Sequence, residues 1–145
     1  DYLIESLSII DYLEECFPTP NLLGESVNER AKTRQMERLA DLQVLTPIGR
    51  YIHATNSPVG RPVSVDVANQ ARQAFEKGLG YLEAGLAHGR EFLMGERLTL
   101  ADCTLAAGLQ FARFANLDLL AQHPNLQRWD VTYRKRDAAR RVLSV

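Results

Sequence analysis

The side chains with the widest chemical range in this chain are two cysteines and three histidines. Zinc-type sites take ligands from closely spaced pairs, and His53, His88 and His123 show no such spacing. Cys103 lies in an apolar stretch without a cationic neighbour in the sequence, so we interpret it as a small core residue. Cys16 is interpreted as structural in the same way. The sequence therefore predicts no metal site, no thiol chemistry and reduced cysteines.

Thr99 and Asp102 have the spacing of a reciprocal helix cap. The Thr99 hydroxyl can accept the backbone N–H of Asp102, and the Asp102 carboxylate can accept the N–H of Thr99. Leu100, Leu105 and Leu109 then make the following helix apolar on most sides. A buried donor without a partner costs about 1–3 kcal/mol, so such a cap matters most where water is excluded. The pair predicts a buried central helix that begins at Thr99.

Helical periodicity elsewhere supplies the elements that surround this helix. Proline ends the first of them in the stretch FPTPNLLGES, which we interpret as a stiff connector and a domain boundary. Pro47 and Gly49 are expected to kink or break the second. Gly78, Gly80 and Gly85 lie inside the third, where we expect close helix–helix approach. The expected helices run from Glu5 to about Cys16, from Ser26 through GRYIHATN, from about Val65 to Ala87, from Thr99, through HPNLQRWDVTYRKR and through DAARRVLSV.

Composition limits the class of protein. The 145 residues are 46% hydrophobic and 24% charged, with a formal net charge of −1, which is ordinary for a globular domain. A neutral chain gives no global field for nucleic acid, and the basic run RKRDAARR is interpreted as solvated surface. No apolar run reaches the ~18 residues of a spanning helix. We therefore expect a cytoplasmic protein that binds neither nucleic acid nor membrane.

Three blocks of sequence resemble the glutathione S-transferase family. FLMGERLTLADCTLA is similar to its stretch "F-L-x-G-x-x-x-[ST]-x-A-D", which leads into the central helix of the all-α C-terminal domain. ESLSIIDYLEECFP resembles "E-S-x-x-I-x-x-Y-L" and the proline after it, at the end of the thioredoxin-like domain. HPNLQRWDVTYRKRDAARRVL resembles "P-x-[IL]-x-x-W" and the short helix that follows. The blocks stand in the family's order and cover nearly the whole chain.

The resemblance implies an all-α fold of the transferase C-terminal type with a remnant of a truncated thioredoxin-like domain. Residues 1–17 would be that remnant, a last strand at Tyr2 to Ile4 and a last helix. Residues 18–25 would be the linker, and 26–145 the helical domain. About two-thirds of the usual N-terminal domain would then be absent, including the Tyr, Ser or Cys that stabilises the glutathione thiolate. No catalytic residue is therefore assigned.

The same resemblance implies glutathione as co-substrate and no metal. Glu5 and Ser6 match the acidic-Ser pair that binds the γ-glutamyl end of glutathione, and their alternative role is simply to start the helix. Arg34, Arg38 and Asp41 fall near the pocket for the electrophile; a solvated face or dimer contacts are the alternatives.

Two functions are open at this point. In the first, the parent protein conjugates or reduces small electrophiles with glutathione, and this chain forms the helical half of the site and is inactive alone. In the second, the chain is a non-catalytic assembly module of the same family. A carrier of apolar ligands is a weaker third. The parent is expected to be a homodimer. The face carrying Ile9, Ile10 and Leu13 is expected to associate with a second chain, and packing back on the bundle is the alternative.

Overall fold

The fold is a helical bundle built around one central helix. The computed structural model describes residues 2–143, and the all-α class is confirmed there, with one isolated bridge between Phe92 and Gly95 and no strand. The elements in chain order are α1 (Ser6–Cys16), α2 (Val27–Ala40), the π-helical η1 (Asp41–Leu45), α3 (Thr46–Thr55), α4 (Val65–Gly85), the 3₁₀ turn η2 (Ala87–Gly89), α5 (Leu100–Phe114), α6 (Pro124–Arg134) and α7 (Asp137–Val142).

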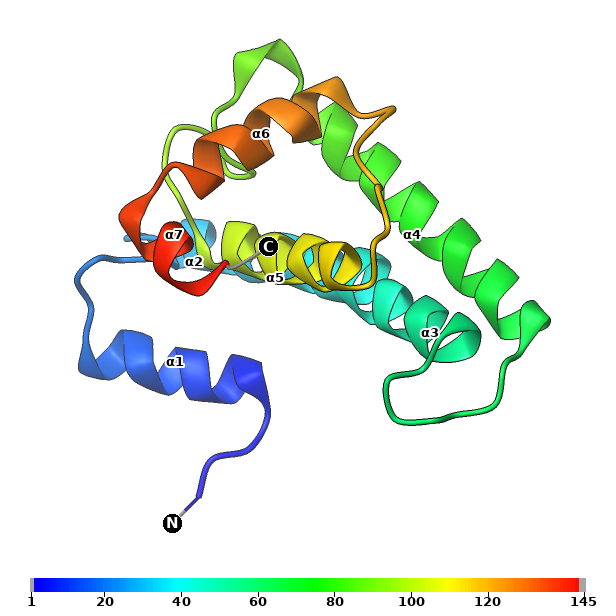
Figure 1. Ribbon diagram of the computed structural model, residues 1–145. Coiled ribbons are helices and arrows are strands. Elements are labelled where there is room, and N and C mark those ends of the chain that lie inside the picture. Colours follow the sequence, from blue (N-terminus) through cyan, green and yellow to red (C-terminus); the bar gives the residue numbers. More distant parts are fainter. Residues whose placement is uncertain (1, 144–145) are drawn as a thin grey trace.

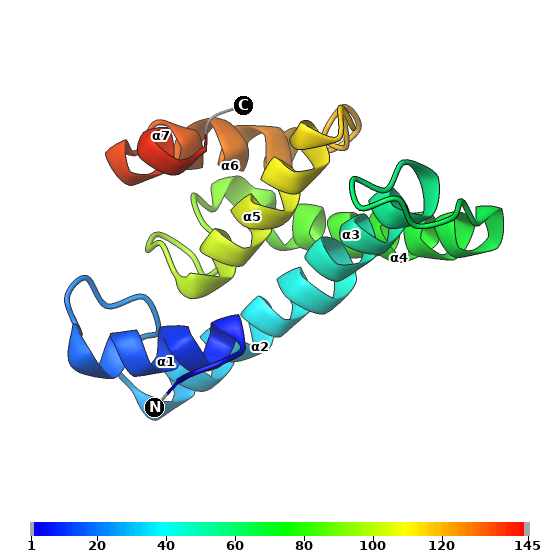
Figure 2. The same ribbon diagram turned by 60° about the horizontal axis from the view of Figure 1, so that its bottom comes forward.

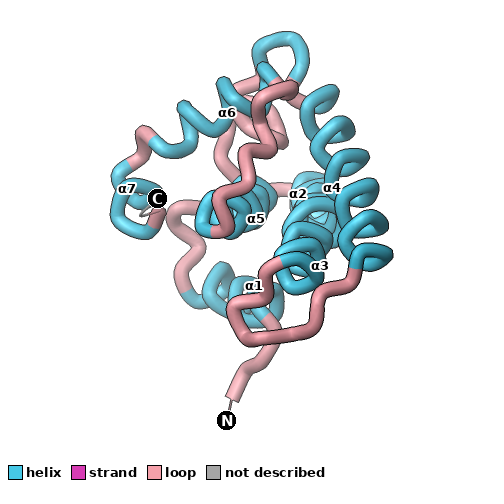
Figure 3. Tube along the Cα trace, turned by 45° about the vertical axis from the view of Figure 1, so that its right-hand side comes forward, coloured by secondary structure: helices cyan, strands magenta, loops and turns pink. Residues whose placement is uncertain are grey.

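Helix α5 is the centre of the bundle. The other bundle helices surround it in two views of the chain (Figures 1 and 3), and α2, η1, α3 and α6 all contact it. A helix that is enclosed in this way must be apolar on most of its surface. Its buried residues are Leu100, Ala101, Asp102, Leu105, Ala106, Gly108, Leu109 and Ala112. The capped, buried helix predicted from the sequence is therefore present.

Helix α2, the π turn η1 and helix α3 follow one another without a gap and form one long rod (Figure 2). The sequence placed the disturbance at Pro47 and Gly49, whereas it lies just before them. Pro47 has no N–H, so the carbonyl of Gln43 lacks its helical partner. The backbone widens to π geometry in this stretch, and the N–H of Thr46 bonds to the carbonyl of Asp41. Gly49 continues α3 without a break.

The Gln43 carbonyl packs against α4 at Gly78. A Cβ on Gly78 would lie inside the contact distance of this oxygen, and it would also crowd the Gln43 carbonyl carbon and Cβ. A Cβ on Gly80 or Gly85 would meet nothing within 4 Å. The expectation of close approach therefore holds at Gly78 and is wrong at the other two glycines, which face open space.

Helices α4 and α6 cap each other's ends. The Glu83 carboxylate accepts from the N–H groups of Asn125 and Leu126 at 2.9 and 2.8 Å, at the start of α6. In return Arg128 donates to the carbonyl of Leu86, just after α4, at 2.7 Å. These contacts satisfy backbone groups at the two helix ends and fix where α6 starts.

The N-terminal segment lies apart from this frame. Helix α1 has no buried residue, and it sits beside α2 (Figure 2). Tyr2 to Ile4, predicted as a remnant strand, forms no strand, and Tyr2 is 99% exposed. No strand lies within residues 2–143, so the backbone N–H and C=O groups of Tyr2 to Ile4 have no strand to pair with. No helix of the described chain has both the length and the apolar character to cross a bilayer.

The contact at Gly78 generates a prediction. We expect Gly78→Ala to lower the free energy of unfolding by about 1–3 kcal/mol, because backbone atoms of η1 or α4 must move to admit the methyl group. Gly80→Ala is the matched control on the same helix. It should be neutral or stabilising by up to about 1 kcal/mol, because alanine favours the helix and the site is open. Urea unfolding followed by circular dichroism measures both, and equal stability of the two variants would contradict the close approach.

Candidate functional site

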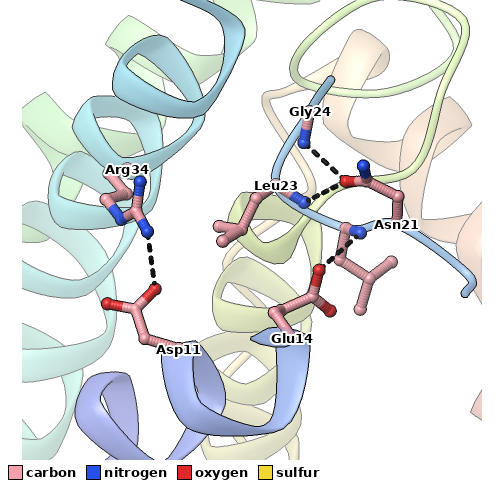
Figure 4. Close-up of polar contacts among 7 residues, drawn as sticks. Asp11, Glu14, Asn21, Leu23, Gly24 and Arg34 are labelled. Atoms are coloured by element: carbon pink, nitrogen blue, oxygen red, sulfur yellow. Dashed lines mark hydrogen bonds and ion pairs between the residues drawn. The ribbon is translucent and has the colours of Figure 1, made fainter. Parts of the chain in front are cut away.

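A polar junction joins α1 to α2 (Figure 4). The Asp11 carboxylate accepts from the Arg34 guanidinium at 3.0 Å, and Glu14 accepts from the N–H of Leu22 in the connector at 3.0 Å. The Asn21 side chain folds the connector, because its Oδ1 accepts from the backbone N–H groups two and three residues further along the chain. A cavity of about 340 Å³ lies among these side chains. Because the Asp11–Arg34 pair is more than one-third exposed, it holds α1 only weakly.

Glu5 and Ser6 stand at the start of α1, and both are exposed. Glu5 is a non-glycine residue with a φ of 71°, a backbone conformation that costs about 1–3 kcal/mol. Its side chain makes no cap bond to the helix. Its backbone carbonyl accepts from the N–H of Ile9 at 3.1 Å, so Glu5 stands at the helix start, and its contact with a ligand stays a prediction.

The three charged residues predicted near an electrophile pocket are divided between two contacts. Arg34 reaches α1, as described, whereas Arg38 pairs with Asp41 at 2.8 Å on the same side of the α2–η1 rod. Asp41 also accepts from the Thr46 hydroxyl at 2.9 Å, across the π turn. Arg34 and Arg38 thus each have a carboxylate beside them. This surface of α2 is therefore polar, with its positive charges balanced by negative ones.

Glu37 is a buried acid that the sequence analysis missed. Its side chain is 6% exposed, its Oε1 accepts from the Thr104 hydroxyl of α5 at 3.3 Å, and its Oε2 has no hydrogen-bond partner. Burial raises the pKa of Glu37, and nearby Arg38 opposes this effect. The sequence did contain a sign of this burial. Glu37 shares the spacing of one helix face with three other residues, and all four are buried: Thr33, Glu37, Ala40 and Val44.

Asp102 accepts four hydrogen bonds within the core. The capping box forms, and its carboxylate Oδ2 accepts from both the N–H and the hydroxyl of Thr99 at 2.9 Å. Oδ1 accepts from the N–H of Leu93 and from the indole Nε1 of Trp129, each at 2.9 Å. Burial raises the pKa of Asp102, while these four donors favour its ionised form. The Leu93 and Trp129 contacts were not foreseen, because they join residues far apart in sequence.

The two thiols differ in their surroundings. Burial raises the pKa of the Cys103 thiol, which keeps it protonated, and raises that of its neighbour Tyr133 as well. Cys16 is exposed and unpaired, and neither cysteine forms a disulfide. Among residues 2–143, no three His, Cys, Asp or Glu side chains are grouped as metal ligands would be.

The four bonds to Asp102 predict a large effect of a small change. In Asp102→Asn one oxygen becomes an NH₂ group, so, whichever way the amide turns, a buried backbone N–H, that of Thr99 or that of Leu93, loses its acceptor. We expect the free energy of unfolding to fall by at least about 1–3 kcal/mol. Asp66→Asn, at the exposed start of α4, is the control and should cost less than about 1 kcal/mol. Denaturant titration decides, and similar losses in the two variants would show that the Asp102 network is not stabilising.

Glu37 predicts a pH dependence. The pKa of Glu37 is higher in the folded protein than in the unfolded chain. Its contribution to the free energy of unfolding is therefore fully present below the unfolded pKa, about 4.3. That contribution is lost as pH rises through the folded pKa. Glu37→Gln keeps the acceptor for Thr104 but carries no charge. Its urea midpoint should therefore exceed that of the wild type at pH 7–8, with the gap closing toward pH 4, whereas Glu91→Gln in an exposed loop should show no such trend. A gap that is constant with pH would refute the assignment.

Comparison with known protein sequences gives the same family as the three sequence blocks. The family model for the glutathione S-transferase C-terminal domain matches residues 65–129. Glutathione S-transferase 2 of Saccharomyces cerevisiae is 24% identical over 147 residues, which cover 99% of this chain and 63% of the yeast protein. A probable maleylacetoacetate isomerase of Vibrio cholerae is 32% identical over 129 residues, covering 86% and 58%. Elongation factor 1-gamma of Danio rerio is 29% identical over 132 residues, covering 90% and 28%. The chain thus spans less than two thirds of these curated relatives.

Solved structures extend the match to the fold. A glutathione S-transferase domain-containing protein from Marinobacter aquaeolei superimposes with a TM-score of 0.83 at 29% identity, over 94% of this chain and 68% of that one. A glutathione S-transferase from Methylobacillus flagellatus, solved with glutathione bound, superimposes with a TM-score of 0.83 at 26% identity, over 96% and 68%. The buried, capped helix α5, the surrounding helices and these relatives agree: the chain belongs to the glutathione S-transferase family and has the fold of its all-α C-terminal domain.

Proposed function

We propose that this chain forms the helical side of a glutathione-dependent site that conjugates or reduces small electrophiles. The observation that carries the proposal is the likeness to the Methylobacillus flagellatus transferase, whose structure contains glutathione. One relative is named a probable maleylacetoacetate isomerase, so isomerisation is a further reaction that the whole protein could perform on such substrates. Glutathione is then a co-substrate, and the chemistry needs no metal.

Glu5 and Ser6 are the proposed contacts for the γ-glutamyl end of glutathione. At the start of α1, Ser6 offers a hydroxyl and a backbone N–H to a carboxylate, where the helix dipole also favours negative charge. The Glu5 carboxylate can accept from the α-ammonium group. Its positive φ and its lack of a cap bond support this role, because they leave the side chain available to a ligand.

Arg34, Arg38 and Asp41 are proposed to border the electrophile pocket. They lie along the α2–η1 rod beside α1, and their charges are already paired with Asp11 or with one another. Paired charges add little net field, so these residues would shape and hydrate the pocket and would not attract a charged substrate.

In this proposal the chain is divided as the sequence indicated. Residues 1–17 belong to the glutathione-binding half, 18–25 are the linker, and 26–145 are the helical domain. The weak attachment of α1 supports the division, since no residue of α1 is buried against the bundle. Ile9 and Leu13 are 38% and 45% exposed, which supports association of this face with further protein, and a homodimer in the whole protein.

A non-catalytic assembly module is the second candidate. The specific observation for it is the likeness to elongation factor 1-gamma, at 29% identity over 90% of this chain. The two candidates differ at Glu5 and Ser6, which only a glutathione site requires.

The test is glutathione binding by isothermal titration calorimetry in the whole protein. We expect Ser6→Ala and Glu5→Gln each to weaken binding about tenfold, the loss of one hydrogen bond to a charged group. Glu15→Gln, on the exposed part of the same helix, is the control and should leave affinity unchanged.

Two results would overturn the proposal. If the whole protein binds no glutathione but retains a protein partner, the assembly role is favoured. If the 145-residue chain alone turns over glutathione and a chromogenic chlorodinitrobenzene, it contains a complete site, and the proposed division between two halves is wrong.

A further inference from the structure

A cavity of about 310 Å³ lies where α3 ends and α4 begins. It is lined by residues of α3, of the loop that joins α3 to α4 and of the start of α4. This loop follows one end of the rod of α2, η1 and α3, whereas α1 lies beside α2 toward the other end (Figures 1 and 2). The cavity is therefore separate from the proposed glutathione site, and nothing in that function uses it.

Every ionisable side chain that lines the cavity is basic. Arg50, His53 and Arg61 all border it, and no Asp or Glu is among its lining residues. Two other cavities of the molecule, of about 340 and 480 Å³, are lined by acidic as well as basic side chains. A cleft whose charges share one sign concentrates ligands of the opposite sign, so this cavity favours an anion.

The two guanidinium groups are available to a ligand. Arg50 and Arg61 are both exposed, and within residues 2–143 neither forms an ion pair with a carboxylate. The acid nearest to Arg61 in sequence is Asp66, in the first turn of α4, and it does not line the cavity. A guanidinium presents five N–H donors in a planar fork that matches the oxygens of a phosphate group.

Hydrogen bonds shape the loop that carries Arg61. The N–H of Ser64 donates to the carbonyl of Ala54 at 2.9 Å, which closes the loop at its base. The N–H of Gly60 donates to the carbonyl of Ser57 at 3.1 Å, and this turn comes directly before Arg61. Arg61 thereby lines the same cavity as residues of the last turns of α3.

His53 adds a third polar contact to the two arginines. Its Nδ1 lies 3.0 Å from the Ser57 hydroxyl, an interaction that orients the ring and leaves Nε2 for another partner. Two arginines and a histidine without a lining carboxylate favour a doubly charged anion over a singly charged one, because each added negative charge increases the attraction.

The rest of the lining limits the size of the ligand. Ala54 is buried, Val67 is half-buried and Pro62 is exposed, and together they form an apolar wall. A volume of about 310 Å³ is at the lower end of the range for small-molecule sites, roughly 300–1,000 Å³. A compact molecule with a dianionic group and a small apolar body therefore fits.

We propose that this cavity binds a small phosphomonoester, with Arg50 and Arg61 holding its dianionic phosphate and His53 as the third contact. The body of the molecule lies against the apolar wall. The site is independent of glutathione, and no bond of the ligand is made or broken there.

Two probes of similar shape test the proposal on the full chain. Phenyl phosphate carries two negative charges above its second pKa, about 6, whereas phenyl sulfate carries one. Isothermal titration calorimetry well above that pKa should show at least about tenfold tighter binding of phenyl phosphate. Arg50→Gln and Arg61→Gln should each weaken phenyl phosphate binding about tenfold or more, the loss of a hydrogen bond to a charged group.

Arg90→Gln is the matched control, an exposed site with the same change of charge, and it should leave both affinities unchanged. Equal affinity of the unmodified chain for the two probes overturns the proposal. So does the same phenyl phosphate affinity in Arg61→Gln as in Arg90→Gln.

Mapping on the unmodified chain removes any dependence on how the variants fold. Amide NMR shifts on adding phenyl phosphate should centre on residues 50–67. Shifts confined to α1, or to the connector between α5 and α6, would overturn the proposal by placing the probe on another face.

Vesicles separate a soluble source of the phosphate from a lipid headgroup. Phosphatidic acid in phosphatidylcholine vesicles should retain no more of the chain than phosphatidylcholine alone, and retention on phosphatidic acid without binding of phenyl phosphate overturns the proposal. Phenyl phosphate affinity should be the same with and without saturating glutathione and in Ser6→Ala. Failure of the glutathione experiments therefore leaves this test intact, and the reverse also holds.

Discussion

One buried carboxylate fixes the geometry of the bundle. Asp102 is fully enclosed, and an ion there is tolerated only when hydrogen bonds replace the water it has lost. Its four donors come from three parts of the chain: Thr99 at the start of α5, Leu93 in the preceding loop and Trp129 on α6. The carboxylate therefore sets where the central helix begins and which face of α6 is turned toward it.

Further contacts fix the positions of the other bundle helices one after another, beginning from α5. Trp129 places α6 on α5, and Glu83 and Arg128 then join α6 to the end of α4 through reciprocal end caps. Helix α4 meets the π turn of the α2–α3 rod at Gly78, where only a hydrogen fits. Each step satisfies a backbone group or fills a close contact. Helix α1 takes part in none of these contacts, and no residue of α1 is buried.

Local patterns were enough to predict the helices and the cap at Thr99, because a capping box and a helical stripe are encoded within a few residues. The Asp102–Trp129 bond spans 27 residues, and periodicity carries no information on such a contact. The expected kink was placed too late in the chain. Proline lacks the N–H for the preceding turn and clashes with the carbonyl there, so the backbone adjusts before Pro47, at Asp41–Leu45, and not at Gly49. Likewise Gly78 and Gly80 are indistinguishable in sequence, and only the neighbouring rod separates them.

The glutathione contacts at Glu5 and Ser6 rest on resemblance and stay a prediction. Local sequence pattern revealed neither the positive φ of Glu5 nor the lack of a side-chain cap bond there. Glu37 shows where the frame is least satisfied: within residues 2–143, its Oε2 is the buried side-chain atom without a hydrogen-bond partner, and the Arg38 guanidinium lies 3.9 Å from it. The charges acting on it include Asp11 of α1 and Asp41 of η1, so it lies toward the side where α1 rests. Polar groups around Asp102 are fully paired and resist change. The loosely paired groups lie at the α1 end, so that end can rearrange without disturbing the core.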